Sequence, residues 1–96
     1  MPAYLVVTRE SAIRDPSEID TYSRMNRENP RDPSLTPLVL YGELERLEGD
    51  GPEAVVVLQF PTMEEARAWY NSPAYQAALV HRRKGADWRA FIVQGL

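Results

Sequence analysis

The chain has 96 residues, 44% of them hydrophobic, and a net charge of −3 with an isoelectric point near 5.1. This size predicts a single domain, residues 1–96, and the acidic balance argues against binding to nucleic acid or to anionic membranes. The absence of cysteine excludes disulfides and thiolate chemistry. No apolar run is long enough for a membrane helix, and the N-terminus has no signal-peptide pattern. We therefore expect a soluble, cytoplasmic protein.

The first predicted elements are a strand and a helix. Residues 3–9 (AYLVVTR) are mainly apolar at both odd and even positions, which is typical of a strand covered on both faces. Asp15 and Pro16 predict a helix start, because aspartate caps the first free amides and proline suits the first helical position. The apolar stripe of this helix includes Tyr22. The helix should end before Pro30, because proline disfavours a helical residue in front of it.

Two further strands are predicted in the middle of the chain. Residues 29–37 (NPRDPSLTP) indicate a stiff loop, either functional or a plain spacer. Residues 38–47 (LVLYGELERL) predict the second strand. The Gly-rich turn at residues 48–52 predicts a hairpin into the third strand, residues 54–60 (AVVVLQF), which is again apolar at both parities.

Two short helices and a last strand complete the prediction. Thr62 is predicted to cap the first of these two helices, and Ser72 followed by Pro73 predicts the start of the second. The second helix has a basic last turn, which suits the negative end of a helix dipole, and Gly85 is a natural residue just past its end. Residues 88–94 predict the fourth strand.

This order of elements predicts an α+β fold of the ferredoxin-like βαββαβ type, with an antiparallel four-stranded sheet and helices on one face. The other face of the sheet would then be apolar and bare. Faces of this kind are usually interfaces. We therefore expect a homodimer in which two copies pair symmetrically through this face of the sheet.

Several short runs of residues resemble a known family. They are Glu48-Gly49-Asp50, Val56-Val57-Leu58, Phe60-Pro61, Met63-Glu64, Ala66-Arg67-Ala68-Trp69-Tyr70, Ser72-Pro73 and Tyr75-Gln76. On these residues the chain resembles the bacterial domain of unknown function family 1330. The resemblance implies a dimeric α+β barrel, in a superfamily that includes cofactor-independent monooxygenases, haem-handling proteins and muconolactone isomerase-like enzymes. The chain has Leu40-Tyr41-Gly42 where the family usually has Arg-Gly-Gly.

Five aromatic residues could line a pocket between sheet and helices, which would suit a small apolar or aromatic ligand: Tyr22, Tyr41, Trp69, Tyr70 and Tyr75. Of these, Tyr22, Tyr41 and Trp69 are taken as candidates for ligand binding. The alternative is that aromatic residues at helical spacing simply fill the core, with their polar atoms finding partners. The core interpretation is favoured for Trp69 and Tyr75, and the two interpretations are balanced for Tyr22 and Tyr41.

Two basic residues complete the candidate set. His81, the only histidine, could be a general base or a haem ligand, although its basic helix end favours a solvent-facing or capping role. Arg82 could bind a substrate carboxylate, or form a structural ion pair with Asp87 or Glu64. No residues have the spacing of metal ligands, so we expect neither a metal nor a bound cofactor.

Three functions remain open on the sequence. The first is a homodimeric small-molecule-binding protein with a pocket between sheet and helices. The second, by analogy of fold alone, is a cofactor-independent monooxygenase or isomerase-like enzyme. The third is a structural or interaction dimer without a pocket. Since the chain has no phosphate loop, nucleophile elbow or dinucleotide fingerprint, no catalytic residue is assigned.

Overall fold

Four strands and three helices make up the computed structural model, which describes all 96 residues. In chain order they are β1 (Ala3–Arg9), α1 (Pro16–Glu28), β2 (Thr36–Leu40), β3 (Ala54–Phe60), α2 (Met63–Tyr70), α3 (Pro73–Gly85) and β4 (Trp88–Gln94). The strands form one sheet in the order β2-β3-β1-β4, with every neighbouring pair antiparallel. This confirms the ferredoxin-like fold. None of the helices combines the length and apolar character needed to cross a membrane.

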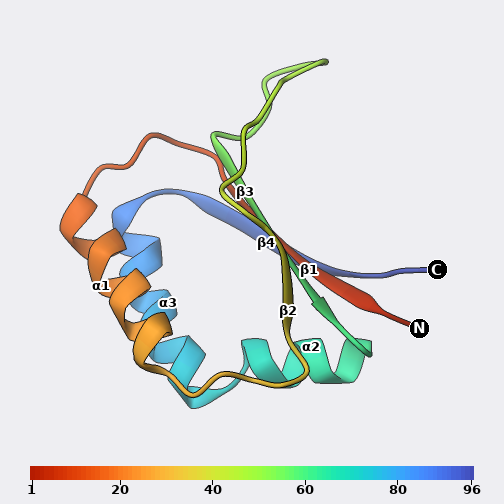
Figure 1. The fold of residues 1–96 in the computed structure, drawn as a ribbon. Coiled ribbons are helices and arrows are strands. Elements are labelled where there is room, and N and C mark those ends of the chain that lie inside the picture. Colours follow the sequence, from red (N-terminus) through yellow and green to blue (C-terminus); the bar gives the residue numbers. More distant parts are fainter.

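All three helices lie on the same side of the sheet. Figure 1 shows α1 and α3 side by side at some distance from the strands, while α2 runs beneath one end of the sheet. Helices α1 and α3 pack mainly against each other, whereas α2 contacts β1, β3 and β4 directly. The α1–α3 pair therefore makes few direct contacts with the strands.

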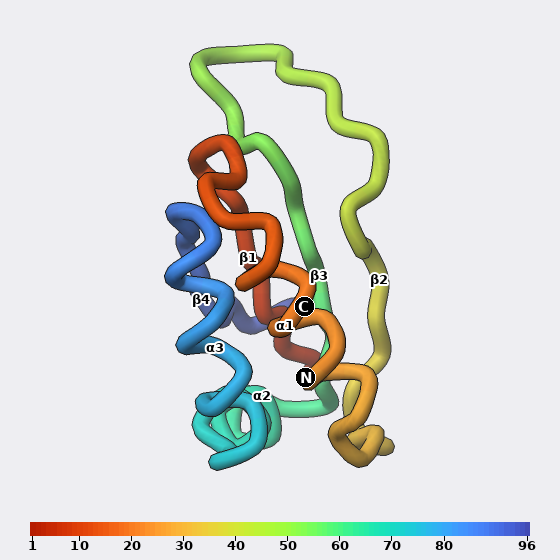
Figure 2. The backbone as a smooth tube through the Cα atoms, turned by 90° about the vertical axis from the view of Figure 1, so that its left-hand side faces the viewer, coloured from red at the N-terminus to blue at the C-terminus, as the bar shows by residue number.

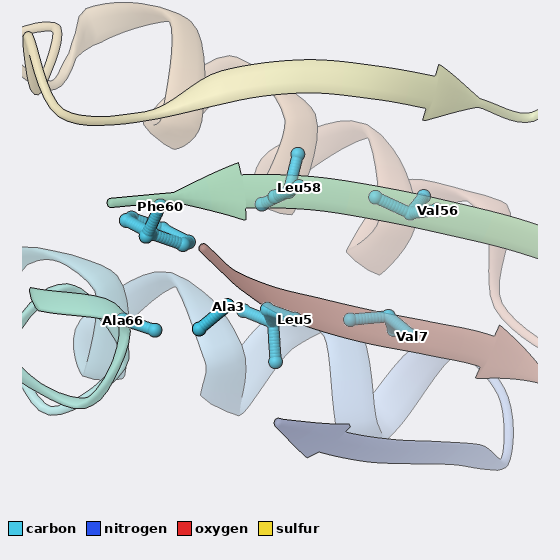
Figure 3. Close-up of a cluster of buried hydrophobic side chains, with 7 residues drawn as sticks. All are labelled: Ala3, Leu5, Val7, Val56, Leu58, Phe60 and Ala66. Atoms are coloured by element: carbon cyan, nitrogen blue, oxygen red, sulfur yellow. The ribbon is translucent and has the colours of Figure 1, made fainter. Parts of the chain in front are cut away.

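The hydrophobic core lies on the helix-facing side of the two central strands. The β1–β3 register pairs Leu5 with Leu58 and Ala3 with Phe60, so alternate residues of both strands share one face. Ala66 of α2 packs onto this face and is fully buried. Figure 3 shows the complete cluster: Ala3, Leu5, Val7, Val56, Leu58, Phe60 and Ala66.

The opposite face of the sheet is mainly apolar and carries no helix. It presents the intervening residues of β1, β3 and β4, which include the polar Thr8, Gln59 and Arg89 and six apolar residues, Tyr4, Val6, Val55, Val57, Phe91 and Val93. On the edge strand β4, Phe91 is 53% exposed and Val93 is 47% exposed. We refer to these six residues as the outer sheet face.

The predicted helix starts are confirmed by their capping bonds. The carboxylate of Asp15 accepts a hydrogen bond from the Ser17 amide at 3.1 Å. The Thr62 hydroxyl accepts one from the Glu65 amide at 3.1 Å, and the Ser72 hydroxyl accepts one at the start of α3. Each cap satisfies an amide that lacks a partner within its helix.

Gly85 has a different role from the predicted one. It is the last residue of α3 rather than a left-handed residue beyond it, and Ala86 takes the capping position. A Cβ atom at Gly85 would overlap the side chain of Ile19 in α1. The absence of a side chain therefore permits the close approach of α1 and α3.

The predicted second strand, residues 38–47, was wrong in both boundaries. β2 spans Thr36–Leu40, so it begins inside the proline-rich segment, and its pairing with β3 is shifted between Pro37 and Val39. It ends because Tyr41 adopts a left-handed backbone with φ of 57°, which turns the chain away from the sheet ladder. The hairpin into β3 exists, but residues 41–53 form a long connection that projects beyond the end of the sheet (Figures 1 and 2).

Candidate functional site

A cavity of about 860 Å³ lies between the helices and the helix-facing side of the sheet. It exists because α1 and α3 pack mainly on each other rather than on the strands. Its floor is apolar and is formed by Val7, Val56 and Leu58, which belong to the core cluster. A volume of this size is typical of pockets for drug-sized molecules.

The proline-rich segment forms one border of the cavity. Its lining residues are Asn29, Pro30, Arg31, Asp32, Leu35 and Pro37. Asp32 holds the turn together, because its carboxylate accepts hydrogen bonds from the amide and the hydroxyl of Ser34 at 2.8 and 2.7 Å. The segment is thus a structured rim of the cavity as well as a connection between α1 and β2.

Aromatic rings from all three helices form one wall. The hydroxyls of Tyr22 and Tyr75 lie 2.8 Å apart, and their rings meet edge to face. The ring of Trp69 lies against Tyr75 with 4.2 Å between centroids, and it also contacts Phe60 of the core. Tyr22 and Trp69 therefore line the cavity and also contribute to packing, which combines the two interpretations that the sequence left open.

Arg82 reaches the same cavity from α3 and is only 3% exposed. Its Nη1 donates a hydrogen bond to the Tyr75 hydroxyl at 3.1 Å, and its guanidinium carbon lies 5.2 Å from the ring centroid of Trp88. The Nε atom is buried and has no hydrogen-bond partner. The site thus contains a buried cation at the end of an aromatic wall.

The expected structural alternative for Arg82, an ion pair with Asp87 or Glu64, is wrong. Asp87 instead pairs with Arg14, with Nη1 and Oδ1 at 2.9 Å, and none of the ion pairs in the structure includes Arg82 or Glu64. The helix carries Arg82 inward on the same face as Tyr75, two turns earlier, whereas Asp87 follows the end of α3 at the surface.

His81 lies outside the cavity lining. Its Nδ1 is 2.5 Å from Oε2 of Glu18, so it links α3 to α1 at the back of the helix pair. The neighbouring position on a helix points in a different direction. The structure therefore brings four of the five candidate residues, Tyr22, Tyr41, Trp69 and Arg82, to one cavity and places His81 elsewhere.

Tyr41 borders the cavity from the sheet side and is 53% exposed. Desolvation by partial burial raises the pKa of its hydroxyl. Burial also raises the pKa of Tyr75 well above its ordinary value. Both phenols are accordingly neutral hydrogen-bonding groups near neutral pH.

Tyr75 was among the residues that could line a pocket, but the sequence favoured a core role for it, whereas in the structure it is buried and also lines the cavity. The available signal was its spacing from Arg82, because residues seven apart on a helix share one face. Chemically, the lining offers hydrogen-bond donors, one buried cation and a large apolar surface. No group of three or more potential metal ligands is present in the structure.

Comparisons with known proteins extend this description. A model of the family described as "Domain of unknown function (DUF1330)" matches residues 2–96. A comparison with curated protein sequences gave no match.

Three solved structures illustrate the similarity of fold. An ethyl tert-butyl ether d (ethd) family protein from Bacillus halodurans has a TM-score of 0.63 at 16% identity, covering 100% of both chains. A dimeric protein of unknown function and ferredoxin-like fold from Bacteroides fragilis has a TM-score of 0.63 at 10% identity, covering 98% of this chain and 96% of that one. SnoaB, a cofactor-independent oxygenase from Streptomyces nogalater, has a TM-score of 0.59 at 12% identity, covering 98% of this chain and 91% of that one.

Proposed function

The chain belongs to the DUF1330 family, and from this premise we propose that it is a homodimeric protein that binds a small, largely apolar molecule between its helices and its sheet. The observation that carries the proposal is the cavity of about 860 Å³ with an apolar floor, an aromatic wall and a few polar atoms. This combination is typical of small-molecule sites. Such a volume filled only with water would leave the apolar floor exposed, so a ligand of matching shape would bury it favourably.

The proposal for the dimer is supported by the outer sheet face. Phe91 and Val93 are both about half exposed there, and no helix of the chain covers them. Apolar faces of this kind are usually interfaces, and two-fold pairing of identical sheets would bury them. The similar protein from Bacteroides fragilis is described as dimeric.

The dimer is tested by placing a charge on this face. We expect Phe91→Glu to convert a dimer into a monomer in light scattering at micromolar concentration, because each copy would bury a carboxylate in the interface without a partner. The matched control is Val80→Glu on the exposed side of α3, which is 48% exposed and lies away from the sheet. A wild-type protein that is monomeric at this concentration would refute the dimer.

The binding site is tested with a neutral apolar dye, N-phenyl-1-naphthylamine, whose fluorescence rises in apolar surroundings. We expect saturable binding that Leu40→Trp weakens at least about tenfold, because Leu40 lines the cavity and a larger side chain there would occupy it. The matched control is Leu47→Trp, at a position that is 84% exposed and outside the lining. Equal effects of the two substitutions, or no binding by the wild type, would contradict a site in the cavity.

A second candidate, a cofactor-independent enzyme, is favoured by one observation. The donors of Tyr22 and Arg82 enter a cavity with an apolar floor, where they could stabilise negative charge that develops on an oxygen atom. SnoaB is described as a cofactor-independent oxygenase, and its similarity to this chain is one of fold. Oxygen uptake with hydroquinone substrates that falls in Tyr22→Phe would support this candidate, and uptake unchanged from the buffer alone would exclude it for those substrates.

A further inference from the structure

We propose that the cavity selects a ligand with an ionised carboxylate, which binds to Arg82 and Tyr22 while its flat apolar body lies along the aromatic wall. This inference rests on the proposed function, because it names the chemical class that the same cavity would take. Three features of the site carry it: an uncompensated cation, the direction of a hydrogen-bond chain, and the balance of charge around the lining.

The first feature is that Arg82 has no counterion. Its side chain is almost completely buried, yet no acidic group forms an ion pair with it. The protein gives the guanidinium a single hydrogen bond, to the Tyr75 hydroxyl, and leaves Nε without one. Buried charges in proteins are normally paired and hydrogen-bonded. A guanidinium carries five donors in a planar arrangement that matches the two oxygens of a carboxylate.

The second feature is the direction of the hydrogen bonds beyond Arg82. Because a guanidinium can only donate, the oxygen of Tyr75 accepts from Arg82. The buried Tyr75 hydroxyl must then donate its own proton, and the oxygen that lies within reach is that of Tyr22, at 2.8 Å. The proton of Tyr22 is consequently left for another acceptor. Since Tyr22 lines the cavity, that acceptor would be an oxygen of the ligand.

The third feature is the charge of the lining. Three arginines, Arg27, Arg31 and Arg82, line the cavity, against one carboxylate, Asp32. One oxygen of that carboxylate already accepts two hydrogen bonds from Ser34. The cavity is therefore cationic in a protein whose net charge is −3. A site with this sign would attract anions and would disfavour cations.

The apolar part of the ligand is indicated by the rings beside Arg82. Trp69, Tyr75 and Tyr22 form a continuous series of ring contacts, and the floor below them consists of valine and leucine side chains. Flat rings bury apolar area effectively against aromatic walls. The proposed ligand is therefore an aromatic or similarly flat acid rather than a small hydrophilic anion.

The test compares two probes of nearly equal shape, anthracene-2-carboxylate and the neutral anthracene-2-carboxamide, by titration calorimetry at pH 7.5. We expect the wild type to bind the carboxylate at least about tenfold more tightly, the scale of a hydrogen bond to a charged group. Arg82→Met should abolish this preference and leave the affinity for the amide within about twofold. Lys84→Met, which removes one positive charge from the exposed last turn of the same helix, should retain it.

The outcomes separate this inference from the proposed function. If the wild type binds both probes equally, or prefers the amide, selection of a carboxylate is refuted while the cavity remains a binding site. If the preference survives in Arg82→Met, the residue assignment is refuted. If neither probe binds and the neutral dye does not bind either, the proposed function itself fails. Loss of the preference in both methionine variants would show a general effect of charge, which also contradicts a specific role for Arg82.

Discussion

Replacing Arg82 by methionine should leave the protein as stable as the wild type or make it more stable. This expectation runs against the usual result, because substitutions of nearly fully buried residues typically destabilise a protein. It follows from the state of the guanidinium, which is buried without a carboxylate and with one donor unpaired. Methionine has a similar length and adapts to irregular apolar space, so it should fill the site without a cavity.

The balance of energies can be worked from the contacts. The substitution removes the hydrogen bond to Tyr75, worth about 1.5–3 kcal/mol for a charged donor. It also removes the cation–π contact with Trp88, worth about 0.5–2 kcal/mol. Against these losses stands the desolvation of the guanidinium, which costs several kcal/mol per buried ion. We therefore expect a change in the free energy of unfolding between about zero and a gain of about 2 kcal/mol.

Urea denaturation at a fixed protein concentration measures this change, and a fixed concentration is needed because dimerisation would shift the midpoint. The control is Leu79→Ala, which removes a fully buried apolar side chain from the same helix and should destabilise by about 2–5 kcal/mol. If Arg82→Met destabilises by about 3 kcal/mol or more, the scale for breaking a buried ion pair, Arg82 is a structural cation. The argument for a missing counterion would then be refuted.

Three further predictions concern the framework of the site. Gly85→Ala should destabilise the protein by about 1–3 kcal/mol through overpacking. Adding Ile19→Val to this variant should recover part of the lost stability, because it shortens the side chain that a Cβ at Gly85 would overlap. Purely additive effects of the two substitutions in urea denaturation would contradict this contact. Trp69→Ala should lower the free energy of unfolding by about 3 kcal/mol, which is at the low end for a buried tryptophan because the residue is only partly buried. A loss below about 1 kcal/mol would show that Trp69 does not belong to the core. The hydrogen bond from the Ser17 side chain holds the pKa of Asp15 below its ordinary value; the stability it contributes is therefore present above the unfolded pKa of about 3.9 and is lost as the pH falls through the lower folded pKa. We expect Asp15→Asn to flatten the acid limb of the stability–pH profile, and an unchanged limb would show that this cap makes no contribution.

The elements that local chemistry determines were predictable from the sequence. Asp15, Thr62 and Ser72 were recognised as helix caps because capping depends on residues only two or three positions away. The strands β1, β3 and β4 were predicted with the boundaries that the structure has, because β1 and β3 are mainly apolar along their length and β4 has an apolar run at residues 90–93 after Trp88. Their antiparallel order followed from the sequence of elements.

The features that depend on three-dimensional contacts were not predictable. The end of β2 is set by the left-handed backbone of Tyr41, and a tyrosine gives no local signal for that conformation. Gly85 was interpreted as a helix stop, whereas its role depends on the approach of Ile19 from another helix. For the site, Arg82 was a candidate on chemical grounds. The sequence could not show that Arg82 lacks an acidic partner, because Asp87 forms its ion pair with Arg14, which is distant in the chain.

The placement of the cavity on the helical side of the sheet determines how a dimer would use it. Because one chain supplies the whole lining, pairing through the outer sheet faces would give two complete sites per dimer, opening in opposite directions. Face-to-face sheets pack about 10 Å apart, so the two ligands would be separated by two layers of strands and would share no side chain. Occupation of one site would then leave the affinity of the other unchanged, and saturation would follow a simple hyperbola with two molecules per dimer.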